Sequence, residues 1–105
     1  MIVAKQDALR SLGVAGPFAG GRQLYYVYLL VSVANPHKRY VGSTSDLRTR
    51  LSAHNSGKSP HTTKHRPWRL VTYLAFSDRQ QAESFDTYLK SGSGHAFARR
   101  RLWGE

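Results

Sequence analysis

The fold is decided by the stretch Leu24–Val33, which reads LYYVYLLVSV. It is almost continuously apolar and rich in aromatic and β-branched side chains, which is typical of a buried strand. The next residues, Asn35–Lys38 (NPHK), have the chemistry of a tight turn. The segment Arg39–Ser43 (RYVGS) then predicts a shorter second strand, antiparallel to the first. The regular part of the chain therefore begins with a β-hairpin.

A helix and a third strand follow the hairpin. Ser45 or Asp46 can cap the first turn of this helix, which runs to about Asn55 and is ended by Gly57. Residues 58–67 form a polar loop. The segment Trp68–Phe76 (WRLVTYLAF) predicts the third strand because it again combines aromatic, β-branched and aliphatic residues.

Two further helices complete the pattern. Ser77 forms a capping box with Gln80 in front of a long helix over Asp78–Lys90. The glycines at 92 and 94 break that helix, and His95–Leu102 predicts a last, strongly basic helix. The order β-β-α-β-α-α predicts an α+β domain over residues 24–105, with a three-stranded antiparallel sheet flanked by helices.

The first 23 residues differ from this domain. Five glycines and prolines fall between positions 13 and 21. Such a composition cannot offset the entropy that is lost when a packed element forms, so we expect residues 1–23 to be a flexible arm. A short helix over Ala4–Leu12 is compatible with the sequence.

Composition narrows the classes of function. The chain has 105 residues, no cysteine, and 16 Lys+Arg against 6 Asp+Glu, for a formal net charge of +10. Without cysteine, a disulfide scaffold, a thiol nucleophile and cysteine-based metal sites are excluded. No apolar run approaches the ~20 residues of a membrane span, and the start does not resemble a signal peptide. We therefore expect a soluble, cytoplasmic monomer with a phosphate-rich partner, ahead of an anionic membrane surface.

Helical spacing shows which charged residues of the first helix border the core. At 100° per residue, Arg50 and His54 fall on the same side as Leu47 and Leu51, whereas Arg48 faces solvent. A guanidinium beside the core costs several kcal/mol unless it meets an anion. Either a carboxylate of the protein or a phosphate of a ligand must therefore lie near Arg50.

The same spacing separates the two acids of the second helix. Relative to Phe85, Asp86 borders the buried face and Glu83 faces water. Asp86 has two interpretations that the helix angle does not decide between. It can form an i,i+4 ion pair with Lys90, or it can bind a metal ion.

A set of short motifs resembles the GIY-YIG nucleases, in particular the small single-domain bacterial members. Tyr26-Val27-Tyr28 and Tyr40-Val41-Gly42 on the two hairpin strands resemble the paired motif that names the family. Ten residues after Tyr40 comes Arg50, one turn later His54, and then the ending His-Asn-x-Gly. Further similarity is found at Pro67-Trp68 and over Phe85–Gly94, so that the resemblance covers roughly residues 24–102.

The resemblance implies a metal-dependent DNA endonuclease that hydrolyses phosphodiester bonds without a covalent intermediate. Tyr28 or Tyr40 would be the general base toward water, helped by His54, and Arg50 would stabilise charge on the phosphate. Asp86 would hold one Mg²⁺ or Mn²⁺ ion. Asp86 stands where the family has Glu, and the segment after Gly94 lacks the downstream Asn of some members.

Basic residues outside this set predict a surface that holds a nucleic-acid backbone. They fall in the 58–67 loop and toward the C-terminus: Lys58, Lys64, His65, Arg66, Lys90, Arg99 and Arg100. Phosphate contacts give affinity without sequence choice, so we expect single-stranded or structured DNA as the substrate. Two alternatives remain: a nucleic-acid-binding module of this fold with little or no catalysis, and a basic RNA-associated protein. The family includes DNA repair enzymes, but the fold alone does not choose the pathway.

Overall fold

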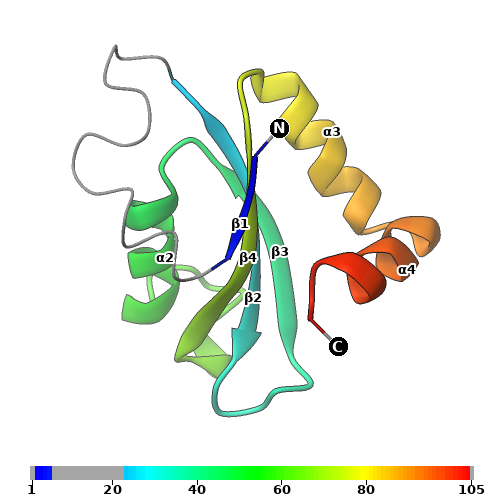
Figure 1. The fold of residues 1–105 in the computed structure, drawn as a ribbon. Coiled ribbons are helices and arrows are strands. Elements are labelled where there is room, and N and C mark those ends of the chain that lie inside the picture. Colours follow the sequence, from blue (N-terminus) through cyan, green and yellow to red (C-terminus); the bar gives the residue numbers. More distant parts are fainter. Residues whose placement is uncertain (1, 6–22, 105) are drawn as a thin grey trace.

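A four-stranded antiparallel sheet forms the centre of the molecule, in the strand order β1-β4-β2-β3 (Figure 1). The computed structural model describes residues 2–5 and 23–104. The strands are β1 (Ile2–Lys5), β2 (Tyr25–Ser32), β3 (Arg39–Thr44) and β4 (Trp68–Phe76). The predicted hairpin and third strand are confirmed as β2, β3 and β4, and the α+β class with them.

Strand β1 corrects the sequence analysis. Ile2–Lys5 was assigned to a flexible arm, but it pairs with β4, with Ile2 opposite Ala75 and Lys5 opposite Thr72. The sheet therefore has four strands instead of three, and Ala4 and Lys5 are extended, not helical. Residues 6–22, which hold the rest of the predicted arm and helix, lie outside the described residues.

The first described helix, α2 (Leu47–Ser56), begins and ends where its sequence predicts. The side chain of Asp46 accepts a hydrogen bond from the Thr49 N–H at its N-terminus. Gly57 takes a left-handed conformation, with a φ of 85°, at its C-terminus. A short 3₁₀ turn, η1 (Thr63–His65), lies in the polar loop that follows.

The C-terminal helices differ from their prediction in how they begin. Helix α3 (Arg79–Leu89) is capped by Asp78, whose side chain accepts from the Gln81 N–H, and not by Ser77. Helix α4 (Gly92–Arg101) is capped by Ser91, so the glycines predicted to break the helix form the first turn of the next one. A Cβ on Gly94 would lie 1.7 Å from the Tyr88 carbonyl oxygen, so glycine is needed where the two helices meet.

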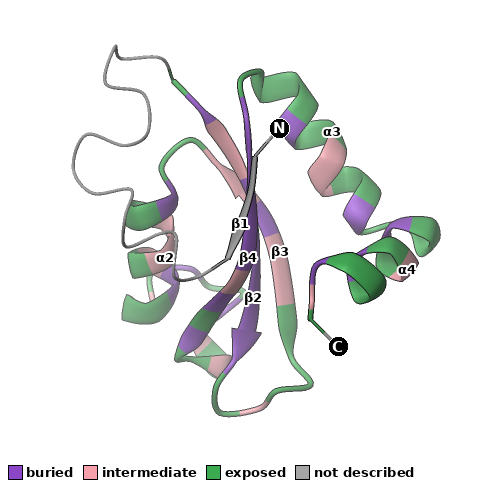
Figure 2. Ribbon diagram, viewed as in Figure 1, coloured by how far each residue is buried: buried purple, intermediate pink, exposed green. Residues whose placement is uncertain are grey.

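The sheet separates two layers of helices. Helix α2 covers one face, and α3 and α4 cover the other (Figure 1). The buried residues of the sheet form a separate hydrophobic cluster on each face (Figure 2). Tyr28 and Leu47 belong to the cluster on the α2 face, whereas Val27, Ala82 and Leu89 belong to the cluster on the other face. In the described part of the chain, no helix has the length and apolar character needed to cross a membrane.

Candidate active site

Tyr28 lies at the centre of the candidate site. It stands in the middle of β2, between Gly42 of β3 and Tyr73 of β4, and is 1% exposed. A Cβ at position 42 would lie 2.7 Å from the Tyr28 hydroxyl oxygen and 2.8 Å from a ring carbon of Tyr40. Gly42 therefore leaves the space in which these two side chains meet.

Helix α2 brings Arg50 and His54 to the Tyr28 hydroxyl. Arg50 Nε donates to Tyr28 Oη at 3.4 Å, and His54 Nε2 lies 2.8 Å from the same oxygen. His54 is completely buried and Arg50 is half-buried, whereas Arg48 is exposed. The orientation predicted from helical spacing is thus confirmed for all three residues.

Tyr40 completes the aromatic part of the site. Its ring centroid lies 4.9 Å from that of His54 in an edge-to-face arrangement and 6.1 Å from that of Tyr28. Tyr40 is half-buried, so it is more accessible than Tyr28. The structure therefore brings together Tyr28, Tyr40, Arg50 and His54, which come from two strands and one helix.

Thr62, which is not among the residues predicted from the sequence, contacts the other nitrogen of the His54 ring. Its hydroxyl lies 2.7 Å from His54 Nδ1, and its backbone carbonyl accepts from Trp68 Nε1 at 2.7 Å. The hydroxyl also donates to the Ser59 carbonyl at 3.4 Å. Thr62 is 1% exposed although it lies in a polar loop. No sequence pattern marks it, because a threonine among lysines and histidines is typical of a surface loop.

Burial keeps both members of the Tyr28–His54 pair neutral. Burial raises the pKa of Tyr28 to about 12, against a smaller lowering by the hydrogen bond from Arg50. Burial, together with the nearby positive charge of Arg50, lowers the pKa of His54 below its usual 6.5. The hydrogen bond to Tyr28 raises the pKa of Arg50, which stays charged. The site at neutral pH thus holds one positive charge beside two neutral groups.

Asp86 lies on α3, across the sheet from α2. Its side chain is 16% exposed, and Lys90 Nζ lies 3.2 Å from Oδ1 and donates to Oδ2 at 3.4 Å. The i,i+4 ion pair is therefore present, yet Oδ1 is buried and accepts no hydrogen bond. An acidic oxygen in that condition is suited to a hard cation such as Mg²⁺. Among the described residues, no group of three or more His, Asp or Glu side chains gathers around a common point.

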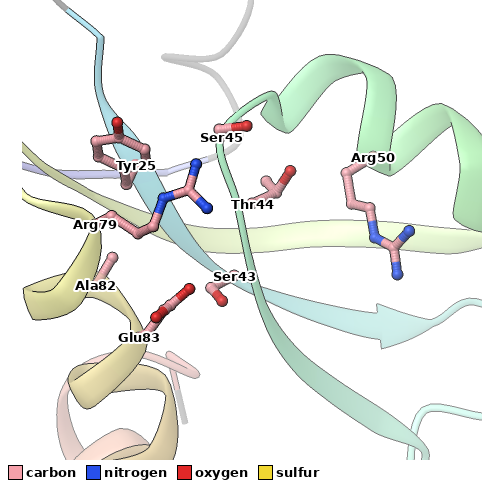
Figure 3. A pocket seen from close by; sticks show the side chains of 8 residues that line it. All are labelled: Tyr25, Ser43, Thr44, Ser45, Arg50, Arg79, Ala82 and Glu83. Atoms are coloured by element: carbon pink, nitrogen blue, oxygen red, sulfur yellow. The ribbon is translucent and has the colours of Figure 1, made fainter.

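A cavity of about 300 Å³ opens between the end of β3 and the start of α3 (Figure 3). Arg50 reaches it from α2 and Arg79 from α3, and Glu83 also lines it. The Arg79 guanidinium lies over the Tyr25 ring, 5.2 Å from its centroid. Glu83 is exposed, as predicted, but it lines the same cavity as Arg50. No motif in the sequence marks Arg79.

Comparison with protein families matches residues 24–99 to the GIY-YIG catalytic domain. The chain belongs to the GIY-YIG family. The matched segment contains Tyr28, Tyr40, Arg50, His54 and Asp86, so the resemblance drawn from the motifs is confirmed.

Individual relatives of this GIY-YIG domain are bacterial and fungal. A UPF0213 protein of Lacticaseibacillus paracasei is 33% identical over 72 residues, which cover 68% of this chain and 79% of the relative. A UPF0213 protein of Streptococcus pneumoniae is 36% identical over 64 residues, covering 60% of this chain and 65% of the relative. The structure-specific endonuclease subunit SLX1 of Candida dubliniensis is 35% identical over 85 residues. That match covers 74% of this chain and 28% of the fungal protein.

The GIY-YIG domain distributes its predicted nucleic-acid-binding residues over two regions. Lys58, Lys64 and Arg66 are exposed beyond the C-terminal end of α2, whereas His65 is half-buried and packs edge-on against Trp68. Lys90 and Arg99 line a second cavity, beside Arg39–Val41 of β3. Arg100 is exposed on α4. Lys90, Arg99 and Arg100 are therefore separate from the basic residues of the 58–67 loop.

Asn55 attaches helix α2 to the sheet of the GIY-YIG domain. Its side-chain amide donates to the Trp68 carbonyl at 3.1 Å, and its oxygen accepts from the Trp68 N–H. Both backbone groups at the start of β4 are thus bound by one side chain. Asn55 is part of the His-Asn-x-Gly ending, so the motif marks this residue in the sequence, although it does not show the contact with Trp68.

Proposed function

We propose that this GIY-YIG domain is a metal-dependent endonuclease that hydrolyses phosphodiester bonds in DNA. The observation that carries the proposal is the hydrogen-bonded series from Arg50 through Tyr28 and His54 to Thr62. In this series the Arg50 guanidinium, which can bind a phosphate, donates to the Tyr28 hydroxyl, and His54 lies on the other side of that hydroxyl as a proton acceptor. The fungal relative is a structure-specific endonuclease subunit, which supports structured DNA as the substrate, and we propose single-stranded DNA beside it.

The direction of the hydrogen bonds follows from the capacity of each group. With the proton of His54 on Nδ1, the ring donates to Thr62, and the threonine hydroxyl donates on to the Ser59 carbonyl. Nε2 is then free to accept the Tyr28 proton at 2.8 Å. In this tautomer Tyr28, His54 and Thr62 each donate and accept, while Arg50 only donates, as expected for buried polar groups and a guanidinium.

Tyr28 then acts as the general base only while the reaction proceeds. The pKa of Tyr28, raised to about 12, lies far above that of His54, which is lowered below its usual 6.5. At rest the proton therefore stays on Tyr28. As water attacks phosphorus, it gives a proton to Tyr28 Oη, which passes its own proton to His54 Nε2. The bond from phosphorus to the leaving oxygen breaks in the same displacement.

The remaining residues stabilise charge. Arg50 would bind the non-bridging oxygens of the phosphate, because its charge faces a cavity and its hydrogen bond is to a neutral hydroxyl. Asp86 would hold one Mg²⁺ or Mn²⁺ ion through its buried Oδ1, which accepts no hydrogen bond, and the ion would replace Lys90 as the charge beside that oxygen. The ion, when bound, supplies positive charge to the leaving oxygen. Tyr40 would keep the His54 ring in place through the edge-to-face contact at 4.9 Å.

A specific observation favours a second candidate, a nucleic-acid-binding module without useful catalysis. The aspartate at position 86 is one methylene shorter than glutamate, and it already forms an ion pair with Lys90. A displacement of about 1 Å at a catalytic group can cost about a hundredfold in rate. In that case the domain would bind DNA or RNA through its basic residues and leave the strand intact.

Cleavage of labelled single-stranded, duplex and branched DNA, with Mg²⁺ or Mn²⁺, tests the proposal. Arg50→Ala should lower the rate by about a hundredfold, as removal of a charge-stabilising donor does. Arg48→Ala is the matched control, because it removes the same charge from an exposed position of the same helix, and it should change the rate less than about threefold. Equal losses in both variants would contradict the role given to Arg50.

Asp86→Glu separates the two candidates. If the wild-type protein binds every substrate but cuts none, while Asp86→Glu cuts, the reach of the carboxylate is the reason and the second candidate holds. If neither cuts any DNA, the endonuclease proposal fails. Wild-type cleavage that Asp86→Ala leaves unchanged would show that Asp86 does not hold the metal ion. Retention of RNA without DNA cleavage would support an RNA-binding function.

A further inference from the structure

A second cavity, of about 450 Å³, lies on the face of the sheet that α3 and α4 cover, at the Arg39 end of β3. Its basic lining residues come from three elements: Arg39, Lys90, His95 and Arg99. Trp103 forms part of the wall, and the Arg39 guanidinium lies 4.6 Å from the centroid of the Trp103 ring. None of the residues that line this cavity is acidic.

This charge distribution points to an anionic occupant. Four basic side chains from separate elements line a space of limited size, and although Lys90 also holds an ion pair with Asp86, no carboxylate lines the space itself, so the local potential favours an anion. A phosphate oxygen can accept hydrogen bonds from Arg99 and Lys90 together.

The cavity adjoins the candidate active site. Tyr40 lines it and also packs against His54 at 4.9 Å. Lys90, on the other wall, is the ion-pair partner of Asp86. The cavity thus begins next to the residues proposed to act on the phosphate and the metal ion.

The two cavities follow one strand. The Arg50 cavity lies against Ser43 and Thr44 of β3, and the second cavity lies against Arg39–Val41. The six residues of β3 span about 17 Å at ~3.4 Å per residue. A DNA strand rises ~3.4 Å per nucleotide, so a strand that runs along β3 passes both cavities within about five nucleotides.

We propose that the cavity between β3 and α4 is a second phosphate subsite, which holds a neighbouring phosphate of the strand whose scissile phosphate lies at Arg50. The inference rests on the proposed nuclease function for its ligand. The subsite fixes the position of the strand along β3. It strengthens substrate binding, so it lowers KM and leaves kcat unchanged.

Arg99 and Arg101 give a matched test. Both are exposed, both lie in α4 and both carry one positive charge, but Arg99 lines the cavity and Arg101 does not. Binding of a fluorescent single-stranded oligonucleotide is measured in EDTA, where it does not depend on cleavage. Arg99→Ala should weaken binding by about tenfold, the loss of one charge-assisted contact. Arg101→Ala should weaken it less than about threefold, as a diffuse charge does.

The indole N–H signal of Trp103 in an NMR spectrum provides a local readout. When the unlabelled oligonucleotide is added at a concentration near the wild-type Kd, this signal should shift in the wild-type protein and should shift much less in Arg99→Ala. Equal weakening by both arginine substitutions, or a Trp103 signal that does not move, would overturn the subsite. A melting curve of each variant shows that the loss is not unfolding.

The outcomes also separate the subsite from the nuclease function. If the wild-type protein cuts DNA while both variants bind and cut equally, the subsite is wrong and the nuclease proposal stands. If binding depends on Arg99 in the expected way but no DNA is cut, the endonuclease proposal fails and the phosphate subsite stands. If the wild-type protein binds no oligonucleotide, both are wrong.

Discussion

Replacement of Thr62 by valine should damage the site without touching any residue of the family motifs. Valine keeps the approximate shape of threonine but removes the hydroxyl that lies 2.7 Å from His54 Nδ1. His54 is completely buried, so water cannot replace the lost partner. A buried donor left without a partner costs about 1–3 kcal/mol. For a domain of this size that corresponds to a fall in Tm of roughly 4–20 °C.

The same substitution should change the chemistry. Without the acceptor at Thr62, the proton of His54 is no longer held on Nδ1, and Nε2 loses its role as acceptor for Tyr28 in part of the molecules. We expect kcat for DNA cleavage to fall by about tenfold or more, within the range of general base catalysis. The ¹⁵N chemical shifts of the ring report the tautomer directly, and they do so even if the protein cuts no DNA.

Thr63→Val is the control for this prediction. The Thr63 hydroxyl hydrogen bonds to the carbonyls of Gly57 (2.9 Å) and Ser59 (2.8 Å) in the same loop, but it does not contact His54. Thr63→Val should lower stability while the His54 tautomer and kcat stay as in the wild type. If both variants leave the ring nitrogens unchanged, Thr62 does not set the tautomer and the direction given to the hydrogen-bond series is wrong.

Three further predictions concern stability. Gly94→Ala should lower the urea midpoint of unfolding strongly, because the added Cβ would lie 1.7 Å from the Tyr88 carbonyl oxygen. Gly92→Ala, whose Cβ would have no atom within 4 Å, should leave the midpoint equal or higher. Equal midpoints of the two variants would contradict the close contact between the helices. Asn55→Ala should cost about 1–3 kcal/mol in chemical unfolding, because both backbone groups of Trp68 lose a partner, and an unchanged midpoint would show that α2 is held otherwise. Stability should fall as the pH drops below about 6.5, because His54 takes up a proton in the unfolded chain more readily than in the folded protein. Unfolding at pH 7.5 and 5.5 measures this, and His54→Gln should remove most of the difference.

Local patterns predicted most of the elements. Trp68–Phe76 is found as β4 with the predicted bounds, and Gly57 ends α2 in the left-handed conformation that favours glycine. Both the strand and the end of the helix are determined by the types of a few neighbouring residues, so a local pattern is enough to predict them. The cap of α3 shows the limit of this reasoning, because Ser77 and Asp78 are adjacent and both can cap a helix.

What the sequence did not reveal depends on distant contacts. Strand β1 is four residues long, and its partner Ala75 is far along the chain from Ile2, so no local pattern marks the pairing. The role of Thr62 likewise depends on a histidine in another element. Helical spacing could place Arg50 and His54 toward the core, but it could not show that a hydroxyl of β2 would meet them there.

The Tyr28 hydroxyl is the group that Arg50 meets beside the core. A guanidinium beside the core required an anion, either a carboxylate or a ligand phosphate. Among residues 23–104, no carboxylate forms an ion pair with Arg50, and its hydrogen bond goes to Tyr28 Oη, which burial keeps protonated. Burial keeps His54 neutral as well. Arg50 therefore has no ion-pair partner among the described residues, and in the adjoining cavity it lies with Arg79 against the single carboxylate of Glu83, which leaves an excess of positive charge for a phosphate. The same burial that makes Tyr28 a poor base at rest thus leaves the arginine ready for the substrate.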